Sequence, residues 1–457
     1  MRLKISGGRV YDPGQGWQGE VRDLYLEGGR IVSPLKKVDR VIEAQGKVVL
    51  AGGIELRGQV ATYGLNFLRL WGGVPSPQEL GEGYAALGYT HVHEPFLTLA
   101  TANYVHRELA ALPLVDTSAS LVLNLRDLDL WLKSRERLAE VGQTVQLLLE
   151  KTRALNFRVV EPFVRYRQDF YAPRTIKTEA ALEILTELAR TLEMTVALEA
   201  SPEVLGGSLP EPRVFHLAAL GPALTDDGLL AAALAHLEQG ATGDLGLMDP
   251  KNSGGNGVPP VRLDLGWFRP LDLCPGPDTT LAKRALRLAL AYQGANLAFS
   301  GAGAMAAPLK DYPKFFSWLW DAGARRQDWG EELGDREYSL SEWVWATRNL
   351  PARLLGLADR GHLGLGARAD VAIYDLAPEA PTGQWLKDLG YCRTLIKAGE
   401  IIIDDFTLVQ PDAAKATYYR RTEAEPGPLL TEICQYRSFR PENLWVQPWP
   451  EITWGPV

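Results

Sequence analysis

Leu50-Ala51-Gly52-Gly53-Ile54-Glu55-Leu56-Arg57-Gly58-Gln59-Val60 is the stretch that decides the fold. Residues 41–50, which precede it, are typical of two short strands joined at a glycine turn, and the pattern after it changes to alternating helices and strands. The stretch is therefore predicted to begin a large α/β domain. Side chains two apart in a strand point to the same side, so Arg57 and Gln59 are expected to share one face where this strand ends.

After residue 60 the predicted elements repeat in the order helix, then strand. Candidate helices cover residues 77–87, 138–155, 179–192 and 280–293, and candidate strands follow them at residues 89–93, 157–160, 195–199 and 295–300. This order predicts parallel strands joined by crossover helices. A chain of 457 residues has room for an α/β barrel of the (β/α)8 type, about 250 residues or more, and a smaller domain.

The smaller domain is predicted from short alternating segments at both ends of the chain. Neither end has enough strands to bury a core alone, so residues 1–50 and 365–410 are expected to form one composite β-sandwich, with the barrel at residues 51–364 between them. Residues 411–457 are predicted to be an extension rich in tryptophan and proline. Two alternatives remain open for this extension: it wraps over its own barrel, or it docks on a neighbouring protein chain.

Composition excludes several classes of function. The net charge is -8 with acids and bases interspersed, which argues against nucleic acid and anionic membranes as partners. Three cysteines lie far apart without a CxxC pair, so neither a disulfide framework nor a zinc ribbon is indicated, and a cytoplasmic location is expected. No long apolar run that is typical of a membrane helix occurs.

Residues 336–374 follow the predicted barrel and are the second informative region. They include Asn349-Leu350-Pro351-Ala352-Arg353-Leu354-Leu355-Gly356-Leu357 and then Gly366-Ala367-Arg368-Ala369-Asp370-Val371. Gly88-Tyr89-Thr90 with Glu94-Pro95, and Asp311-Tyr312-Pro313 before an aromatic helix, belong to the same pattern. The combination resembles the amidohydrolase-like subunit of formylmethanofuran dehydrogenase, and its relative in the bacterial formyltransferase/hydrolase complex, within the amidohydrolase superfamily.

This resemblance implies a dinuclear zinc centre, bridged by a carboxylated lysine, that cleaves or forms an N-formyl bond. Carried over residue by residue, the centre is mostly lost here. The degenerate positions are Arg57 and Gln59 for the His-x-His pair, Arg158 for the lysine, Glu199 and His216 for the later histidines, and Ala302 for the aspartate. A guanidinium has no free lone pair for a metal and forms no carbamate. We therefore expect no catalytic residue, no bound metal and no other cofactor.

Two alternatives retain a functional pocket. His91 and His93, two apart on a predicted strand, could build a relocated metal site with His216 or Glu94. They could also form, with His216, a rearranged C–N hydrolase site. Arg57 and Arg158 could instead bind an anionic cofactor, since guanidinium groups pair with carboxylates. The opposing interpretation of the two arginines is neutralisation inside the protein, by Glu55, Glu161 or Glu199.

The leading hypothesis is a non-catalytic amidohydrolase-like subunit that serves as a scaffold in a one-carbon, formyl-processing complex. A hetero-oligomer with the other subunits of such a complex is expected. The aromatic segment Phe315–Trp320 and the tail Trp445–Trp454 carry large apolar side chains. If both faced outward, they would form a docking surface for those subunits.

Overall fold

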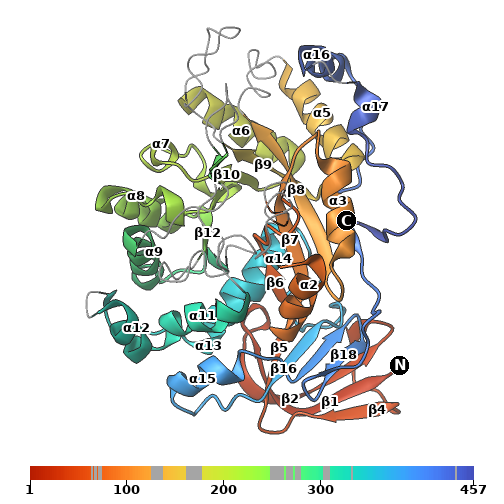
Figure 1. Cartoon of the computed structure of the whole chain (residues 1–457), viewed down its shortest axis with the longest axis vertical. Helices are drawn as coiled ribbons and strands as arrows, with labels where there is room; N and C mark the ends of the chain where they lie inside the picture. Colours follow the sequence, from red (N-terminus) through yellow and green to blue (C-terminus); the bar gives the residue numbers. More distant parts are fainter. Residues whose placement is uncertain are drawn as a thin grey trace.

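The structure is a computed structural model of the chain. It describes residues 1–62, 65, 69, 75–124, 137–160, 178–246, 262–263, 271–272, 279–301, 309–330, 333–437 and 440–457. Two sheets organise these residues: a parallel barrel in the middle of the chain and a smaller sheet built from both ends (Figure 1). The predicted α/β class, with a (β/α)8-type barrel and a small β domain from the termini, is confirmed.

Among the described residues, eight parallel strands form the barrel, and their order in space follows their order in the chain. They are β6 (Gly53–Glu55), β7 (Tyr89–Leu97), β8 (Asp116–Asn124), β9 (Asn156–Val160), β10 (Val196–Glu199), β11 (Phe215–Ala218), β12 (Thr242–Gly246) and β15 (Leu297–Ser300). Apolar residues such as Leu121, Phe157 and Leu217 alternate along these strands with polar residues such as Ser120, Arg158 and His216. The apolar set packs under the surrounding helices, and the polar set contributes the two clusters described below.

Helices connect and cover the barrel strands. They are α2 (Pro77–Ala86), α3 (Ala102–Ala111), α5 (Leu138–Lys151), α6 (Thr178–Leu192), α7 (Pro202–Leu205), α8 (Asp227–Glu238) and α9 (Thr279–Ala291). After β15 come α11 (Tyr312–Trp320), α12 (Ala322–Trp329), α13 (Leu340–Val344), a π-helical turn η7 (Trp345–Asn349) and α14 (Leu350–Leu354). Short 3-10 turns at Pro212–Val214, Gly221–Ala223 and Leu309–Asp311, and a two-stranded ribbon of β13 (Arg262–Leu263) and β14 (Leu271–Asp272), complete this part. A further 3-10 turn, Pro13–Gln15, connects the first two strands of the chain.

The second sheet joins strands from the N-terminal part and from the C-terminal part of the chain, which lie side by side in the lower part of Figure 1. Its N-terminal strands are β1 (Leu3–Asp12), β2 (Trp17–Glu27), β3 (Arg30–Val32), β4 (Arg40–Glu43) and β5 (Val48–Ala51); its C-terminal strands are β16 (Val371–Tyr374), β17 (Thr394–Lys397), β18 (Glu400–Asp404) and β19 (Thr407–Leu408), with α15 (Thr382–Asp388) after β16. The antiparallel pairing of β5 with β16 joins the two halves. Strand β5 leads directly into β6, so this domain adjoins the beginning of the barrel.

The C-terminal tail covers its own barrel. Strand β20 (Thr417–Tyr419) pairs with the first residues of β8, and β21 (Trp454–Pro456) pairs with β20; α16 (Pro428–Arg437) and α17 (Pro441–Leu444) lie between them. Trp454 packs edge-on against His106, and the Arg107 guanidinium lies over the Trp449 ring. Trp454 and Trp449 therefore pack against residues of α3 in their own chain.

The aromatic segment Phe315–Trp320 does not face outward. The docking surface expected from the sequence required that it did. Trp318 and Trp320 are each only 1 % exposed, because α11 packs between other helices and turns these rings into the core. The periodicity showed that the helix is apolar, but not which neighbours cover it. No described helix is both long and apolar enough to cross a membrane.

Candidate functional site

The degenerate positions meet in a small cavity inside the barrel. Its lining includes polar side chains from six strands or strand ends: Arg57, His93, Ser120, Asn156, Arg158, His216 and Asp244. The cavity holds about 30 Å³, which is room for roughly one or two water molecules.

Arg57 is neutralised by Asp244, a residue that the sequence pattern did not single out. Arg57 Nε lies 2.9 Å from Asp244 Oδ2, and both side chains are buried. Asp244 Oδ1 lies 3.2 Å from His216 Nε2 and accepts a hydrogen bond from the Ala219 amide at 2.9 Å. Burial raises the pKa of Asp244, but the Arg57 guanidinium and His216 outweigh it and lower this pKa below its ordinary value. The carboxylate is therefore charged at neutral pH.

Arg158 pairs with Glu199 on the next strand. Arg158 Nη2 lies 3.0 Å from Glu199 Oε2, and the guanidinium also lies over the Phe96 ring. The arginine side chain is 3 % exposed, whereas that of Glu199 is 31 % exposed. Neutralisation of Arg158 by Glu199 was one of the alternatives from the sequence. Glu161, another candidate, lies outside the described residues. The hydrogen bond between Glu55 and Arg57 comes from the backbone amide of Arg57, which donates to Glu55 Oε1 at 2.9 Å.

His91 and His93 belong to a continuous hydrogen-bond chain along the barrel interior. Arg360 Nη1 lies 3.3 Å from His91 Nδ1, and His91 Nε2 lies 2.8 Å from Ser118 Oγ. Ser118 Oγ lies 2.7 Å from His93 Nδ1, and His93 Nε2 lies 2.7 Å from Ser120 Oγ. The Ser120 hydroxyl donates to Asn156 Oδ1 at the cavity wall.

The arginine at one end fixes the direction of this chain. A guanidinium only donates, so His91 Nδ1 accepts from Arg360 and the ring carries its proton on Nε2. The same reasoning makes Ser118 an acceptor from His91 and a donor to His93, which in turn donates from Nε2 to Ser120. Both rings are therefore neutral, and their pKa values agree: burial, with the Arg158 charge, lowers the pKa of His93 to about 3, and burial and Arg360 lower that of His91. Their lone pairs are engaged and not free for a metal.

Glu94 ties down the segment that contains Gln59. Its carboxylate is fully buried and accepts hydrogen bonds from the Ala61 amide at 2.8 Å and the Phe96 amide at 3.0 Å. Desolvation raises the pKa of Glu94 to about 7. Gln59 itself has a left-handed backbone with φ of 48°, which is uncommon for a residue with a side chain. Glu94 therefore acts as a backbone anchor here.

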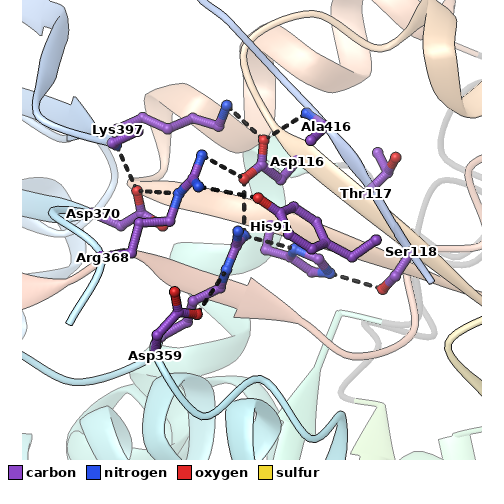
Figure 2. A network of polar contacts seen from close by, with 12 residues as sticks. His91, Asp116, Thr117, Ser118, Asp359, Arg368, Asp370, Lys397 and Ala416 are labelled. Atoms are coloured by element: carbon purple, nitrogen blue, oxygen red, sulfur yellow. Dashed lines mark hydrogen bonds and ion pairs between the residues drawn. The ribbon is translucent and has the colours of Figure 1, made fainter. Parts of the chain in front are cut away.

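A second buried cluster lies at the amino end of the barrel, around Asp116, the first residue of β8 (Figure 2). Its carboxylate is fully buried and receives Lys397 Nζ at 2.7 Å, Arg360 Nη1 at 2.8 Å and Arg368 Nη2 at 3.3 Å. The amide of Ala416, at the start of the tail, donates to it at 2.9 Å. Although burial raises the pKa of Asp116, the three cations lower it below its ordinary value. One carboxylate thus joins the barrel, the terminal sheet and the tail.

The structure brings most of the degenerate positions together. Arg57, Arg158 and His216 line one cavity, with His93 beside them, and Glu199 pairs with Arg158. His91 contacts Ser118 and Arg360 and does not line the cavity. Gln59 is not among the lining residues, and Ala302 lies outside the described residues.

Sequence reasoning missed Asp244 and Asp116. A single acid within a short strand-like segment, as in Thr242-Gly243-Asp244-Leu245, is a signal that could have been followed, because an unpaired buried carboxylate is costly. This signal would not have identified the cation that pairs with the carboxylate.

The residues present do not fit the dinuclear zinc centre that the resemblance implies. Zinc is held by imidazole, thiolate or carboxylate ligands, usually four. Positions 57 and 158 carry guanidinium groups, and the carboxylates of Asp244 and Glu199 are paired with them. Within the described ranges no group of three or more His, Cys, Asp or Glu side chains is placed to hold a metal ion.

The fold and the position of the cavity define the class: an amidohydrolase-type barrel with a small β domain from both termini. The sequence profile of the amidohydrolase family matches residues 285–403. A structural comparison finds a chain of the formyltransferase/hydrolase complex of Methylorubrum extorquens, solved with methylofuran, with a TM-score of 0.83 and 24 % identity, covering 100 % of this chain and 99 % of the other.

Among curated proteins, the chain is similar to FhcA, the corresponding member of the formyltransferase/hydrolase complex from Methylorubrum extorquens. The two are 28 % identical over 524 aligned residues, which cover 93 % of this chain and 92 % of the relative. Protein FwdA of Methanocaldococcus jannaschii is 23 % identical, with 90 % and 89 % covered. The resemblance found in residues 336–374 therefore extends over nearly the whole chain.

Proposed function

We propose that this protein is a non-catalytic amidohydrolase-like subunit of a one-carbon, formyl-processing complex, in which the barrel serves as a scaffold. The observation that carries the proposal is the state of the former pocket: Arg57 pairs with Asp244, Arg158 pairs with Glu199, and about 30 Å³ remains. Similarity along nearly the full length to FhcA, a member of a formyltransferase/hydrolase complex, supports the placement in such a complex.

Charge balance argues against the two rival functions. Two guanidinium groups face two carboxylates, so an added anion would have to compete with Asp244 and Glu199 for the arginines. The histidines of a rearranged hydrolase are neutral members of the hydrogen-bond chain, and His216 is held by Asp244 and Thr242. An anionic cofactor or a substrate carbonyl would have to compete with these contacts for the side chains of the cavity.

Activity and metal content test the non-catalytic part. The full chain, purified without chelators, is expected to contain no stoichiometric zinc and to release no formate from formylated methylofuran, with or without added zinc. A matched variant, His216→Gln, should behave identically. One zinc per chain, or formate release that His216→Gln abolishes, would contradict the proposal.

Assembly tests the scaffold part. The full chain is to be produced alone and together with the other subunits of a formyltransferase/hydrolase-like complex from the same genome, and each sample is measured by size exclusion with light scattering. We expect a stable hetero-oligomer in the second case. A chain that stays monomeric beside those subunits would argue against the scaffold role, whatever the zinc analysis gives.

A further inference from the structure

The barrel sheet is not closed by backbone pairing at one position. Each barrel strand from β6 to β15 is hydrogen-bonded to the next, but within the described residues no ladder joins β15 back to β6. Closed barrels avoid such an edge, because unpaired strand groups are costly when buried. The turn η7 and helix α14 lie against both strands, and Ile54, Leu56 and Ala298 pack with Leu350 and Leu355 there. We call the boundary between β6 and β15 the seam.

Buried polar side chains cross this seam. Ser300, at the end of β15, donates to the Glu55 carboxylate at the end of β6, and its hydroxyl also lies 3.4 Å from the Arg57 carbonyl. The Tyr312 hydroxyl donates to the other oxygen of Glu55 at 3.0 Å. Beyond them Arg57 reaches past β15 to Asp244 on β12, with 2.9 Å between the charged groups.

We infer that Arg57 is a built-in cation that closes the barrel across the seam, in place of the metal ions that the resemblance places inside this barrel. The Arg57–Asp244 pair is the charged link between β6 and the strands beyond the seam. Arg57 is thus a positioning residue, which holds the first strand against the last two. The idea that Arg57 stands in place of metal ions rests on the proposed function, because both take the pocket to be free of metal. The role of Arg57 in closing the barrel does not depend on the proposed function.

The other ion pair in the cavity has a different place in the fold. Arg158 and Glu199 lie on β9 and β10, two strands that already share backbone hydrogen bonds, and Glu199 is partly exposed. Loss of Arg158 therefore leaves a carboxylate that water can solvate and strands that stay paired. Substitution of Arg158 is therefore a matched control, because it removes a guanidinium from the same cavity at a position that does not bridge the seam.

The test is hydrogen–deuterium exchange with mass spectrometry on the full chain and on the variants Arg57→Met and Arg158→Met. Arg57→Met leaves Asp244 buried without its cation, so we expect peptides from β6 and β15 to exchange about 100-fold faster or more. In Arg158→Met the same peptides should change by less than about 5-fold. The double variant Arg57→Met with Asp244→Leu should recover most of the protection, since it removes both charges.

If Arg57→Met does not accumulate as folded protein, the variant Arg57→Lys is used instead. The lysine ammonium is a point charge that reaches less far than the guanidinium, so hydrogen exchange should become faster in β6 and β15 and change less elsewhere. Equal exchange in Arg57→Met and the parent chain, or equal effects of Arg57→Met and Arg158→Met, would overturn the closing role. A separate arm measures thermal unfolding with zinc sulfate or EDTA. An unchanged midpoint of thermal unfolding supports the replacement of metal by Arg57. A midpoint raised by zinc contradicts this replacement and also the proposed function. The hydrogen–deuterium exchange result tests the closing role independently of both.

Discussion

The two buried ionic clusters of the barrel differ in how their charges balance. In the cavity, Arg57 and Arg158 each face one carboxylate, so the cluster is neutral in pairs. At the amino end, the single carboxylate of Asp116 faces three cations, from Lys397, Arg360 and Arg368. The first cluster links strands of one barrel, and the second links the barrel to the terminal sheet and the tail.

This difference separates two uses of buried charge. In the cavity, each paired charge is neutralised by one partner. A shared carboxylate makes several segments depend on one group, because removing it would leave buried cations without a partner. The chain from Arg360 through His91 and His93 to Asn156 runs between the two clusters. The amino end, then, is where a single substitution is expected to do most damage.

The largest expected effect is that of Asp116→Asn. The amide keeps the size of the side chain but removes the charge that Lys397, Arg360 and Arg368 share, which should lower the free energy of unfolding by about 3–5 kcal/mol. Urea denaturation of the full chain measures this. Asp359→Asn is the control, since Asp359 is half-exposed and pairs with Arg360 at 3.7 Å; its loss should cost less than about 1 kcal/mol. Equal costs would remove the distinction between the clusters.

The histidine chain predicts a pH dependence. In the unfolded chain His93 takes up a proton below about pH 6.5, whereas the folded pKa is about 3. Between these values the unfolded state binds the extra proton, so this contribution to stability is present above pH 6.5 and is lost as pH falls toward 3. His93→Gln should lower the slope of unfolding free energy against pH by about 1.4 kcal/mol per unit in that window.

Glu94 acts in the opposite direction and has to be separated from this effect. Its folded pKa of about 7 lies above the unfolded value, so the folded state holds the extra proton and stability falls as pH rises from about 4.5 to 7. The His93→Gln comparison is therefore made in the Glu94→Gln background, by urea denaturation between pH 5 and 6.5. A slope unaffected by His93→Gln would show that the ring is not held neutral.

A smaller effect is expected where the tail meets the barrel. The buried hydroxyls of Thr117 and Thr417 lie 2.9 Å apart, on paired strands beside Asp116. Thr417→Val keeps the shape and leaves one hydroxyl without its partner, which should cost about 1 kcal/mol. The same change at the exposed Thr407 should be neutral. A loss at Thr417 as large as that of Asp116→Asn would show that the tail contact, and not the shared carboxylate, dominates the amino end.

The smallest effect is predicted for Glu199→Gln in the cavity. Glu199 is partly exposed, and its amide replacement can still accept a hydrogen bond from Arg158, so the loss should be about 1 kcal/mol or less by the same denaturation measurement. Asp244→Asn, in the fully buried pair, should cost several times more. If the two changes cost the same, burial does not distinguish the two pairs.

The sequence by itself determined the class of fold and the location of the pocket. Alternating helix and strand patterns require parallel strands, and a chain of 457 residues has room for a (β/α)8-type barrel beside a smaller domain made of the short strands at both ends. The loss of metal ligands could likewise be inferred at Arg57 and Arg158, because a guanidinium cannot act as a ligand wherever it lies.

The carboxylates that pair with these guanidinium groups became known from the folded chain, not from the sequence. Asp244 is far from Arg57 in sequence and meets it because β12 is the neighbour of β15, the strand that lies across the seam from β6. The burial of Trp318 and Trp320 likewise depends on which elements cover α11, and periodicity contains no information about that. Local patterns are set by neighbours in the chain, whereas pairing of charges and burial of faces are set by contacts between distant segments, which only the folded chain brings together.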